Sequence, residues 1–155
     1  LGVCLGHQLV AVALGGEVHR NPDGQQVGVL DVGWAPEAAD DPLLGGVPRP
    51  TRAVQWNDDI VGRLPEEAVL LASAPTGEIQ AARFAPCVWG VQWHPEAGEA
   101  IVRSWTEADR DDVIERGIDV ETPLRSIAAA EHEMQRTWSA LGPAFAALLT
   151  RDRVR

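Results

Sequence analysis

The chain has 155 residues, 45% of them hydrophobic, and a formal net charge of -10, so it is long enough for one domain with a sizeable core. The acidic balance disfavours a nucleic-acid surface, which needs clustered Lys and Arg, and equally disfavours binding to an anionic membrane. The longest apolar run is too short to span a bilayer, and the two cysteines, Cys4 and Cys87, form neither a disulfide framework nor a metal motif, so we expect a cytoplasmic protein without metal or cofactor.

The first motif is LGVCLGHQL at residues 1–9, in which Cys4 lies between two glycines. The spacing G-x-C-x-G resembles the G-x-S-x-G nucleophile elbow, a strained turn from a strand into a helix. We expect Gly2 and Gly6 to make room for the packed strand and helix, and the helix N-terminus to favour a Cys4 thiolate. The backbone N–H of Leu5 would face a developing oxyanion. The alternative is a small buried thiol at a tight turn.

Helix and strand signals follow the elbow in chain order. Residues 8–14 are apolar at helical spacing and end at Gly15 and Gly16. Alternating valines predict a strand over 26–34, and the segment 36–50, rich in Pro and Gly, predicts an irregular connection. Further strands are expected at 53–56, 69–74, 79–84 and 88–93.

The C-terminal third is expected to be helical. An acidic amphipathic helix is predicted over 97–116, and a second helix with Thr122 as its N-cap and Pro123 at its first position. A last helix should run to Leu149. Strands followed by helices predict an α/β fold with an open mixed or parallel sheet, flanking helices and a helical C-terminal tail.

The second motif, VWGVQWHPE, occupies residues 88–96. A cysteine nucleophile needs a base that takes its proton and returns it to the leaving amine. A carboxylate on the far ring nitrogen fixes the tautomer of that base. His94 and Glu96 are two residues apart after a strand-like run, so both could face one crevice. The two motifs together predict a catalytic triad of Cys4, His94 and Glu96.

These motifs resemble those of the class I, triad-type glutamine amidotransferases, which generate ammonia from glutamine. The stretch between them, AVQWNDDIVGRLPEEAVLLASA, is similar to that of stand-alone members related to the amidotransferase domain of GMP synthase. The resemblance covers residues 1 to about 96 and implies a flavodoxin-like fold. It also implies that Cys4 forms a γ-glutamyl thioester, that His94 is the acid/base, that Glu96 orients it, and that Gln8 contacts the bound glutamine.

The sequence departs from the family in two places. Many relatives have W-H-x-D where this chain has WNDD at 56–59. Members also carry several strands before the elbow, so we expect the N-terminal strands to be missing and the sequence to be part of a longer protein. Residues 1–105 would then be the C-terminal part of the amidotransferase domain, and 106–155 a helical extension packed on it. Such a segment, expressed alone, is expected to be poorly soluble or inactive.

Three functions are compatible with these residues. The first is hydrolysis of the glutamine amide, with ammonia passed to an acceptor on a separate synthase polypeptide. The second is a γ-glutamyl hydrolase that acts on γ-glutamyl amines or peptides with the same triad. The third is an inactive fragment that serves as a binding module.

Two residues near these motifs are expected to be structural. His7 lies inside the elbow helix and should pack there instead of acting as a base. Cys87 precedes the second motif and is expected to be a buried, inert thiol.

Overall fold

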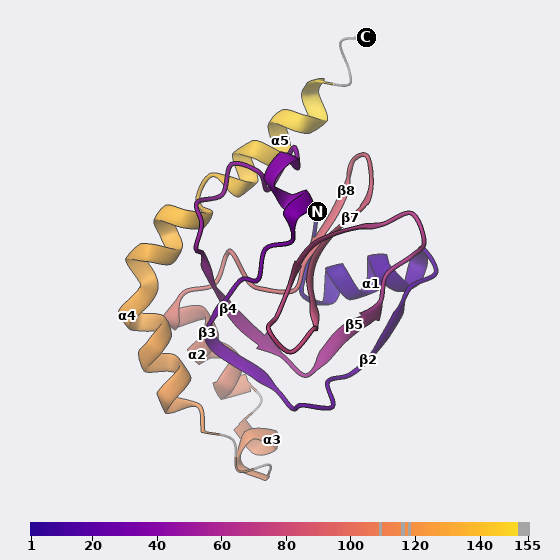
Figure 1. Ribbon diagram of the computed structural model, residues 1–155. Helices are drawn as coiled ribbons and strands as arrows, with labels where there is room; N and C mark the ends of the chain where they lie inside the picture. Colours follow the sequence, from indigo (N-terminus) through magenta and orange to yellow (C-terminus); the bar gives the residue numbers. More distant parts are fainter. Residues whose placement is uncertain (109, 116, 118, 152–155) are drawn as a thin grey trace.

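The computed structural model describes residues 1–108, 110–115, 117 and 119–151. In this part of the chain, a six-stranded sheet and a two-stranded sheet are flanked by helices (Figure 1). The long helix near the C-terminus runs along the outside of the two-stranded sheet (Figure 1). The mixed α/β class expected from the sequence is confirmed.

Apart from α1 and the short helix η1, the strands precede the helices in the chain. The strands are β1 (Gly2–Val3), β2 (Glu17–Arg20), β3 (Gln26–Asp31), β4 (Arg52–Asn57), β5 (Asp59–Arg63), β6 (Val69–Ser73), β7 (Ile79–Ala85) and β8 (Val88–Val91). The helices are α1 (Leu5–Ala13), the short 3-10 helix η1 (Pro36–Asp40), α2 (Glu99–Ala108), α3 (Arg110–Glu115), α4 (Glu121–Trp138) and α5 (Leu141–Arg151). The helical tail predicted from the sequence therefore comprises α2 to α5.

The order of strands in the larger sheet brings the two sequence motifs together. The sheet runs β1-β8-β7-β5-β2, with β6 paired to β7. β1 pairs with β8 in parallel, with Gly2 opposite Gly90 and Val3 opposite Val91. Because parallel strands end at the same edge of a sheet, the residues that follow Val3 and Val91 lie side by side. These are the residues of the elbow and of the segment that leads to the HPE motif.

Helix α1 buries its polar side and exposes an apolar one. His7 and Ala11 face the sheet and are inaccessible to solvent. Leu5, Leu9 and Val12, spaced as one helical stripe, are each more than half exposed. The apolar periodicity therefore predicted the helix correctly, although much of its apolar surface does not enter the core.

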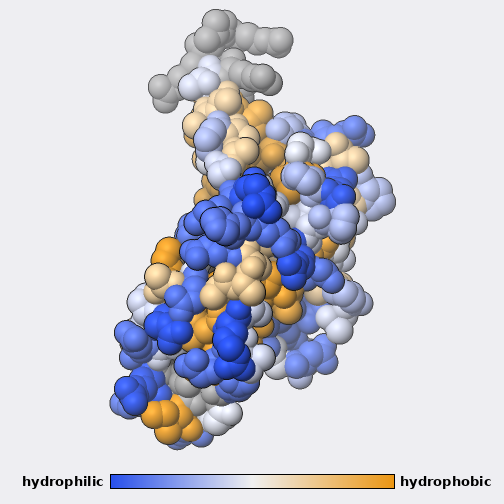
Figure 2. All heavy atoms as spheres, turned by 90° about the vertical axis from the view of Figure 1, so that its left-hand side faces the viewer, coloured by the Kyte–Doolittle hydropathy of each residue, from blue (hydrophilic) through white to orange (hydrophobic). Residues whose placement is uncertain are grey.

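Helix α4 completes the main core by packing against β3 and β4. Its buried side chains recur at intervals of three and four residues, namely Leu124, Ile127, Ala130, Met134 and Trp138. The Trp138 Nε1–H donates a hydrogen bond of 3.1 Å to the carbonyl of Arg52 in β4. Figure 2, which views the molecule from the side of α4, shows a mostly hydrophilic surface there. One face of α4 thus belongs to the same core as the strands.

Two strands, β2 and β5, were not predicted from the sequence. They are short, and their partly polar sequences EVHR and DIVGR lack a clear alternation. Glycine inside a strand also argues against a strand. In the structure, a Cβ atom on Gly62 would lie 2.1 Å from Nε2 of His19, so the glycine leaves space for that side chain on the paired strand.

The predicted start of α4 is wrong by two residues, since the helix was expected to begin at Pro123 and begins at Glu121. Thr122 is not the N-cap, because the helix already begins at Glu121. The Asp119 side chain accepts the backbone N–H groups of Glu121 (3.1 Å) and Thr122 (3.2 Å) and so satisfies the first turn.

The single helix expected over 97–116 is instead two helices, α2 and α3. Residues 109 and 116 of that range lie outside the described residues.

Candidate active site

Cys4 lies at the turn between β1 and α1 with a strained backbone. Its φ of 47° and ψ of -105° fall outside the regions that side chains with a Cβ favour. Its N–H donates a hydrogen bond of 2.9 Å to the carbonyl of Val91 after β8, which holds the turn in place. Leu5 is the first residue of α1, where backbone N–H groups have no partner within the helix. This is the geometry of a nucleophile elbow.

The two glycines of the elbow have different steric roles. A Cβ atom on Gly2 would lie 2.5 Å from the backbone C and O atoms of Gly6, so any side chain there would push the strand and helix apart. A Cβ on Gly6 would meet nothing within 4 Å. The steric prediction is confirmed for Gly2 and wrong for Gly6, because the close approach is made by the backbone of Gly6.

His94 is held beside Cys4 by contacts on several sides. Its backbone N–H donates a hydrogen bond to the carbonyl of Val54 in β4 (2.8 Å). The ring Nδ1 lies 2.7 Å from Oε1 of Glu96. The indole of Trp105 packs against the ring. Burial lowers the pKa of His94, but the interactions with Cys4 and Glu96 outweigh it and raise the pKa to about 9. The imidazole is therefore charged at neutral pH.

The Glu96 carboxylate accepts a hydrogen bond from His94 and helps to keep its ring protonated. Burial tends to raise the pKa of Glu96, but the hydrogen bond with His94 outweighs it and leaves the pKa below its usual value. Glu96 is therefore ionised at neutral pH and fixes the His94 ring through Nδ1. The sequence placed these two residues in one crevice with Cys4, and the structure brings all three together.

A chain of side-chain amides approaches Cys4 from the sheet. Gln92 is inaccessible to solvent, and its Nε2 lies 3.5 Å from the Cys4 Sγ atom as a donor. Gln8 Nε2 donates to Gln92 Oε1 (3.2 Å) and to the carbonyl of Asp59 (2.8 Å). The sequence analysis missed Gln92. The sequence pattern that could have identified Gln92 is its position two residues before His94. In an extended segment this spacing places Gln92 and His94 on the same side, toward Cys4, while Trp93 between them enters the core.

The segment that departs from the family pattern also borders the elbow. The carbonyl of Trp56 lies 4.0 Å from the Cys4 Sγ atom. Asn57 donates from Nδ2 to the carbonyl of Asp59 (3.2 Å), the acceptor that Gln8 also uses. Asn57 therefore shares a backbone acceptor with Gln8.

His7 and Cys87 lie apart from this chemistry. His7 is fully buried against Phe84, with ring centroids 5.4 Å apart, and burial lowers its pKa to about 4. The prediction that His7 packs is confirmed. The prediction that Cys87 is buried is wrong, because it lies exposed in the turn between β7 and β8.

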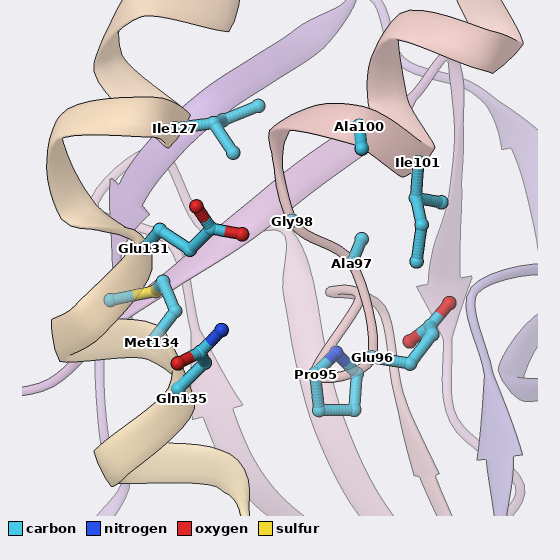
Figure 3. A pocket seen from close by; sticks show the side chains of 10 residues that line it. All are labelled: Pro95, Glu96, Ala97, Gly98, Ala100, Ile101, Ile127, Glu131, Met134 and Gln135. Atoms are coloured by element: carbon cyan, nitrogen blue, oxygen red, sulfur yellow. The ribbon is translucent and has the colours of Figure 1, made fainter.

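A pocket of about 290 Å³ adjoins the turn that carries Glu96. It lies between residues 95–98, the first turn of α2 and one side of α4 (Figure 3). Figure 3 shows Glu131 and Gln135 of α4 extending toward this turn. A Cβ on Gly98 would lie 2.7 Å from Oε1 of Glu131, so the glycine leaves room for that carboxylate.

The arrangement of acidic, histidine and cysteine side chains offers no metal centre in the described ranges, where no three of them gather as ligands. No helix among the placed residues is long and apolar enough to cross a membrane.

Comparison with known proteins identifies relatives over most of the strand-containing part. Residues 1–101 match the family model "Glutamine amidotransferase class-I". The glutamine-hydrolyzing GMP synthase of Aeropyrum pernix is 39% identical over 114 residues, which cover 68% of this chain and 21% of that protein. A subunit of the glutamine-hydrolyzing GMP synthase of Methanosarcina barkeri is 38% identical over 113 residues, covering 69% of this chain and 58% of that protein.

A solved structure extends the similarity to the helical tail. The glutamine amidotransferase of Thermotoga maritima has a TM-score of 0.69 and 27% sequence identity, and the match covers 97% of this chain and 60% of that one. The chain thus spans less than two thirds of the length of each of these relatives.

Proposed function

This chain belongs to the class I glutamine amidotransferase family, and from that membership we propose that it hydrolyses the side-chain amide of glutamine through a γ-glutamyl thioester on Cys4. One observation carries the proposal. A cysteine in a strained elbow interacts with a histidine that is charged at neutral pH and bonded to a carboxylate. That combination activates a thiol for attack on an acyl carbon.

The first half of the reaction transfers the acyl group to Cys4. The thiolate attacks the amide carbon of glutamine, and the oxyanion that forms accepts a hydrogen bond from the Leu5 N–H. His94 then gives its proton to the leaving nitrogen, which departs as ammonia and leaves the thioester. Glu96 occupies Nδ1 of His94, so Nε2 is the nitrogen that serves Cys4.

The second half releases glutamate. Neutral His94 takes a proton from water, and the resulting hydroxide attacks the thioester carbon. The carbon–sulfur bond breaks, so Cys4 regains its thiolate and His94 remains protonated. Gln92 stays within hydrogen-bond reach of the sulfur and stabilises its negative charge at both stages.

The remaining assignments extend this proposal. Gln8 borders the glutamine site, held by Gln92 and the Asp59 carbonyl. Gly2 and Gly6 form the elbow. Ammonia passes to an acceptor enzyme on a separate cytoplasmic polypeptide, which is supported by relatives that are named as one subunit of a synthase.

The helical extension, residues 106–155 of the proposed division, belongs to the same folding unit as the amidotransferase part. Its support is the shared core, in which Ile127 and Trp138 of α4 lie with Val54 of β4. The boundary at 105/106 falls within α2.

The test is ammonia release from glutamine by the wild type, Cys4→Ala and Cys87→Ala. We expect Cys4→Ala to lose about 10³-fold or more of the activity. Cys87→Ala, a matched removal of the exposed thiol, should retain it. Turnover of γ-glutamyl methylamide faster than glutamine would point to the γ-glutamyl hydrolase instead. Full activity in Cys4→Ala would contradict the proposal. So would absence of turnover of both substrates by a protein that also carries the N-terminal strands expected from the sequence.

A further inference from the structure

The His94 ring has a neighbour that lies outside both sequence motifs. The rings of His94 and Trp105 have centroids 4.6 Å apart and planes inclined by 53°. Trp105 lies on α2, beyond residue 101 where the family model ends. Centroids this close bring the imidazolium against the π-system of the indole, whose face attracts a cation because it carries partial negative charge.

We propose that Trp105 is a positioning residue that holds His94 against Cys4 and Glu96 and stabilises its protonated form through the indole face. This role rests on the proposed function, in which His94 gives a proton to the leaving ammonia. Trp105 itself touches neither the thiol nor, in this scheme, the substrate.

Helix α2 is held in place by packing in the main core and against α4. Val102 is inaccessible to solvent within the main core, and Trp105 packs at the edge of the same cluster. Arg103 pairs with Glu99 in the preceding turn of α2 and approaches Glu121 of α4 at 3.8 Å. Helix α2, which carries the indole, is therefore packed against α4.

The titratable groups that interact with the His94 ring come from two other elements. Cys4 lies at the start of α1, and Glu96 lies in the turn after β8; both favour the protonated ring. Trp105 adds attraction for the cation without adding a titratable group. The indole also excludes water from the His94 ring, and this desolvation disfavours the protonated form. A test must therefore remove the aromatic face while keeping the site apolar.

Two substitutions separate these effects. Trp105→Leu retains an apolar side chain without an aromatic face, and Trp105→Phe retains a face. We expect Trp105→Leu to lower the pKa of His94, measured by NMR titration with the His94 signals identified from His94→Asn. We also expect kcat to fall about 3- to 30-fold with KM little changed. Trp105→Phe should keep the pKa of His94 near 9 and kcat within about threefold of the wild type.

The matched control is Trp34→Leu. Trp34 is also a partly buried indole at the main core, but it contacts Trp93 and not His94. It should leave the His94 titration unchanged even where it lowers thermal stability. If Trp105→Leu does not fold, Trp105→Met makes the same comparison, because a thioether fills the space without an aromatic face.

Two results would overturn the inference. One is a non-aromatic variant with an unchanged His94 pKa and unchanged kcat. The other is Trp105→Phe as impaired as Trp105→Leu, which would mean that shape alone matters. The NMR titration needs no substrate, so it reports on Trp105 even if glutamine is not hydrolysed. Failure of the proposed function and failure of this inference therefore give different results.

Discussion

Among single residues, the protonated His94, which interacts with Cys4 and with Glu96, sets the pH range in which the proposed chemistry can work. The pKa of His94 is raised to about 9 in the folded protein, above the ordinary value of about 6.5. The stabilisation that His94 gains from Cys4 and Glu96 is therefore fully present below pH 6.5 and is lost as the pH rises through about 9. In the proposed mechanism, the proton that His94 gives to the leaving ammonia is lost over the same upper pH range.

Replacing the Glu96 carboxylate should shift the upper pH at which His94 loses its proton. In Glu96→Gln we expect the pKa of His94 to fall below 9, because the neutral amide no longer favours the cation. The basic limb of the kcat/KM profile should shift to lower pH, and the rate should fall about 100-fold or more. Stopped-flow or coupled ammonia assays from pH 6 to about 10 measure both.

Glu131→Gln is the control for this substitution. It removes one nearby carboxylate that lines the adjacent pocket but is not bonded to His94. A basic limb that moves equally in both variants would show that general charge, and not the Glu96 hydrogen bond, sets the pKa.

His7 should make the protein sensitive to acid. Its folded-state pKa of about 4 lies below the ordinary 6.5, so the unfolded chain binds the proton first as the pH falls. Stability is therefore lost between about pH 6.5 and 4, with a cost of about 2 kcal/mol at pH 5 relative to pH 8. Urea unfolding at the two pH values measures this cost, and His7→Leu should abolish most of the difference. An equal loss in His7→Leu would place the acid sensitivity elsewhere.

At the scale of elements, the close packing of β1 against α1 depends on Gly2 more than on Gly6. Gly2→Ala places a Cβ 2.5 Å from the backbone of Gly6, and backbone cannot give way as a side chain can. We expect a lower melting temperature and strongly reduced ammonia release, because the elbow must shift.

Gly6→Ala is the matched substitution in the same motif. Its Cβ points into open space, and Ala is favoured over Gly within a helix by about 1 kcal/mol. Its melting temperature should equal or exceed that of the wild type. A Gly2→Ala protein as stable as Gly6→Ala would contradict the close approach seen at the elbow.

At the scale of the whole molecule, the helical tail and the strands share one core. Ile127 of α4 is inaccessible to solvent, so Ile127→Ala should cost about 2 to 5 kcal/mol of unfolding free energy. Far-UV circular dichroism and tryptophan fluorescence should report one coincident transition, since strands and tail unfold together. Leu149→Ala on α5, where the side chain is 43% exposed, should change stability by no more than about 0.5 kcal/mol. Two separate transitions would instead indicate that the tail folds independently.

The parts of the site that could be predicted are those whose residue types recur at a characteristic short spacing in the sequence. Cys4 between glycines, and His94 two residues before Glu96, are short patterns whose residue types already imply a nucleophile and its base. Strands β2 and β5 escaped prediction because they are short, polar and interrupted by Gly62, so they depend on cross-strand pairing with each other. The start of α4 was misplaced because the capping carboxylate, Asp119, lies before the expected Thr122.

By itself, the sequence predicted the α/β class and the helical tail, and it indicated Cys4 as the proposed nucleophile with His94 and Glu96 as its proposed partners, because each of these follows from periodicity or from short local motifs. The parallel pairing of β1 with β8, the amide chain through Gln92, the open space at Gly6 and the contact of Trp105 with His94 were decided only by the tertiary structure. The physical reason is that each of these depends on the distance between segments far apart in the chain. Local spacing carries no information about that distance until the sheet and its helices are packed.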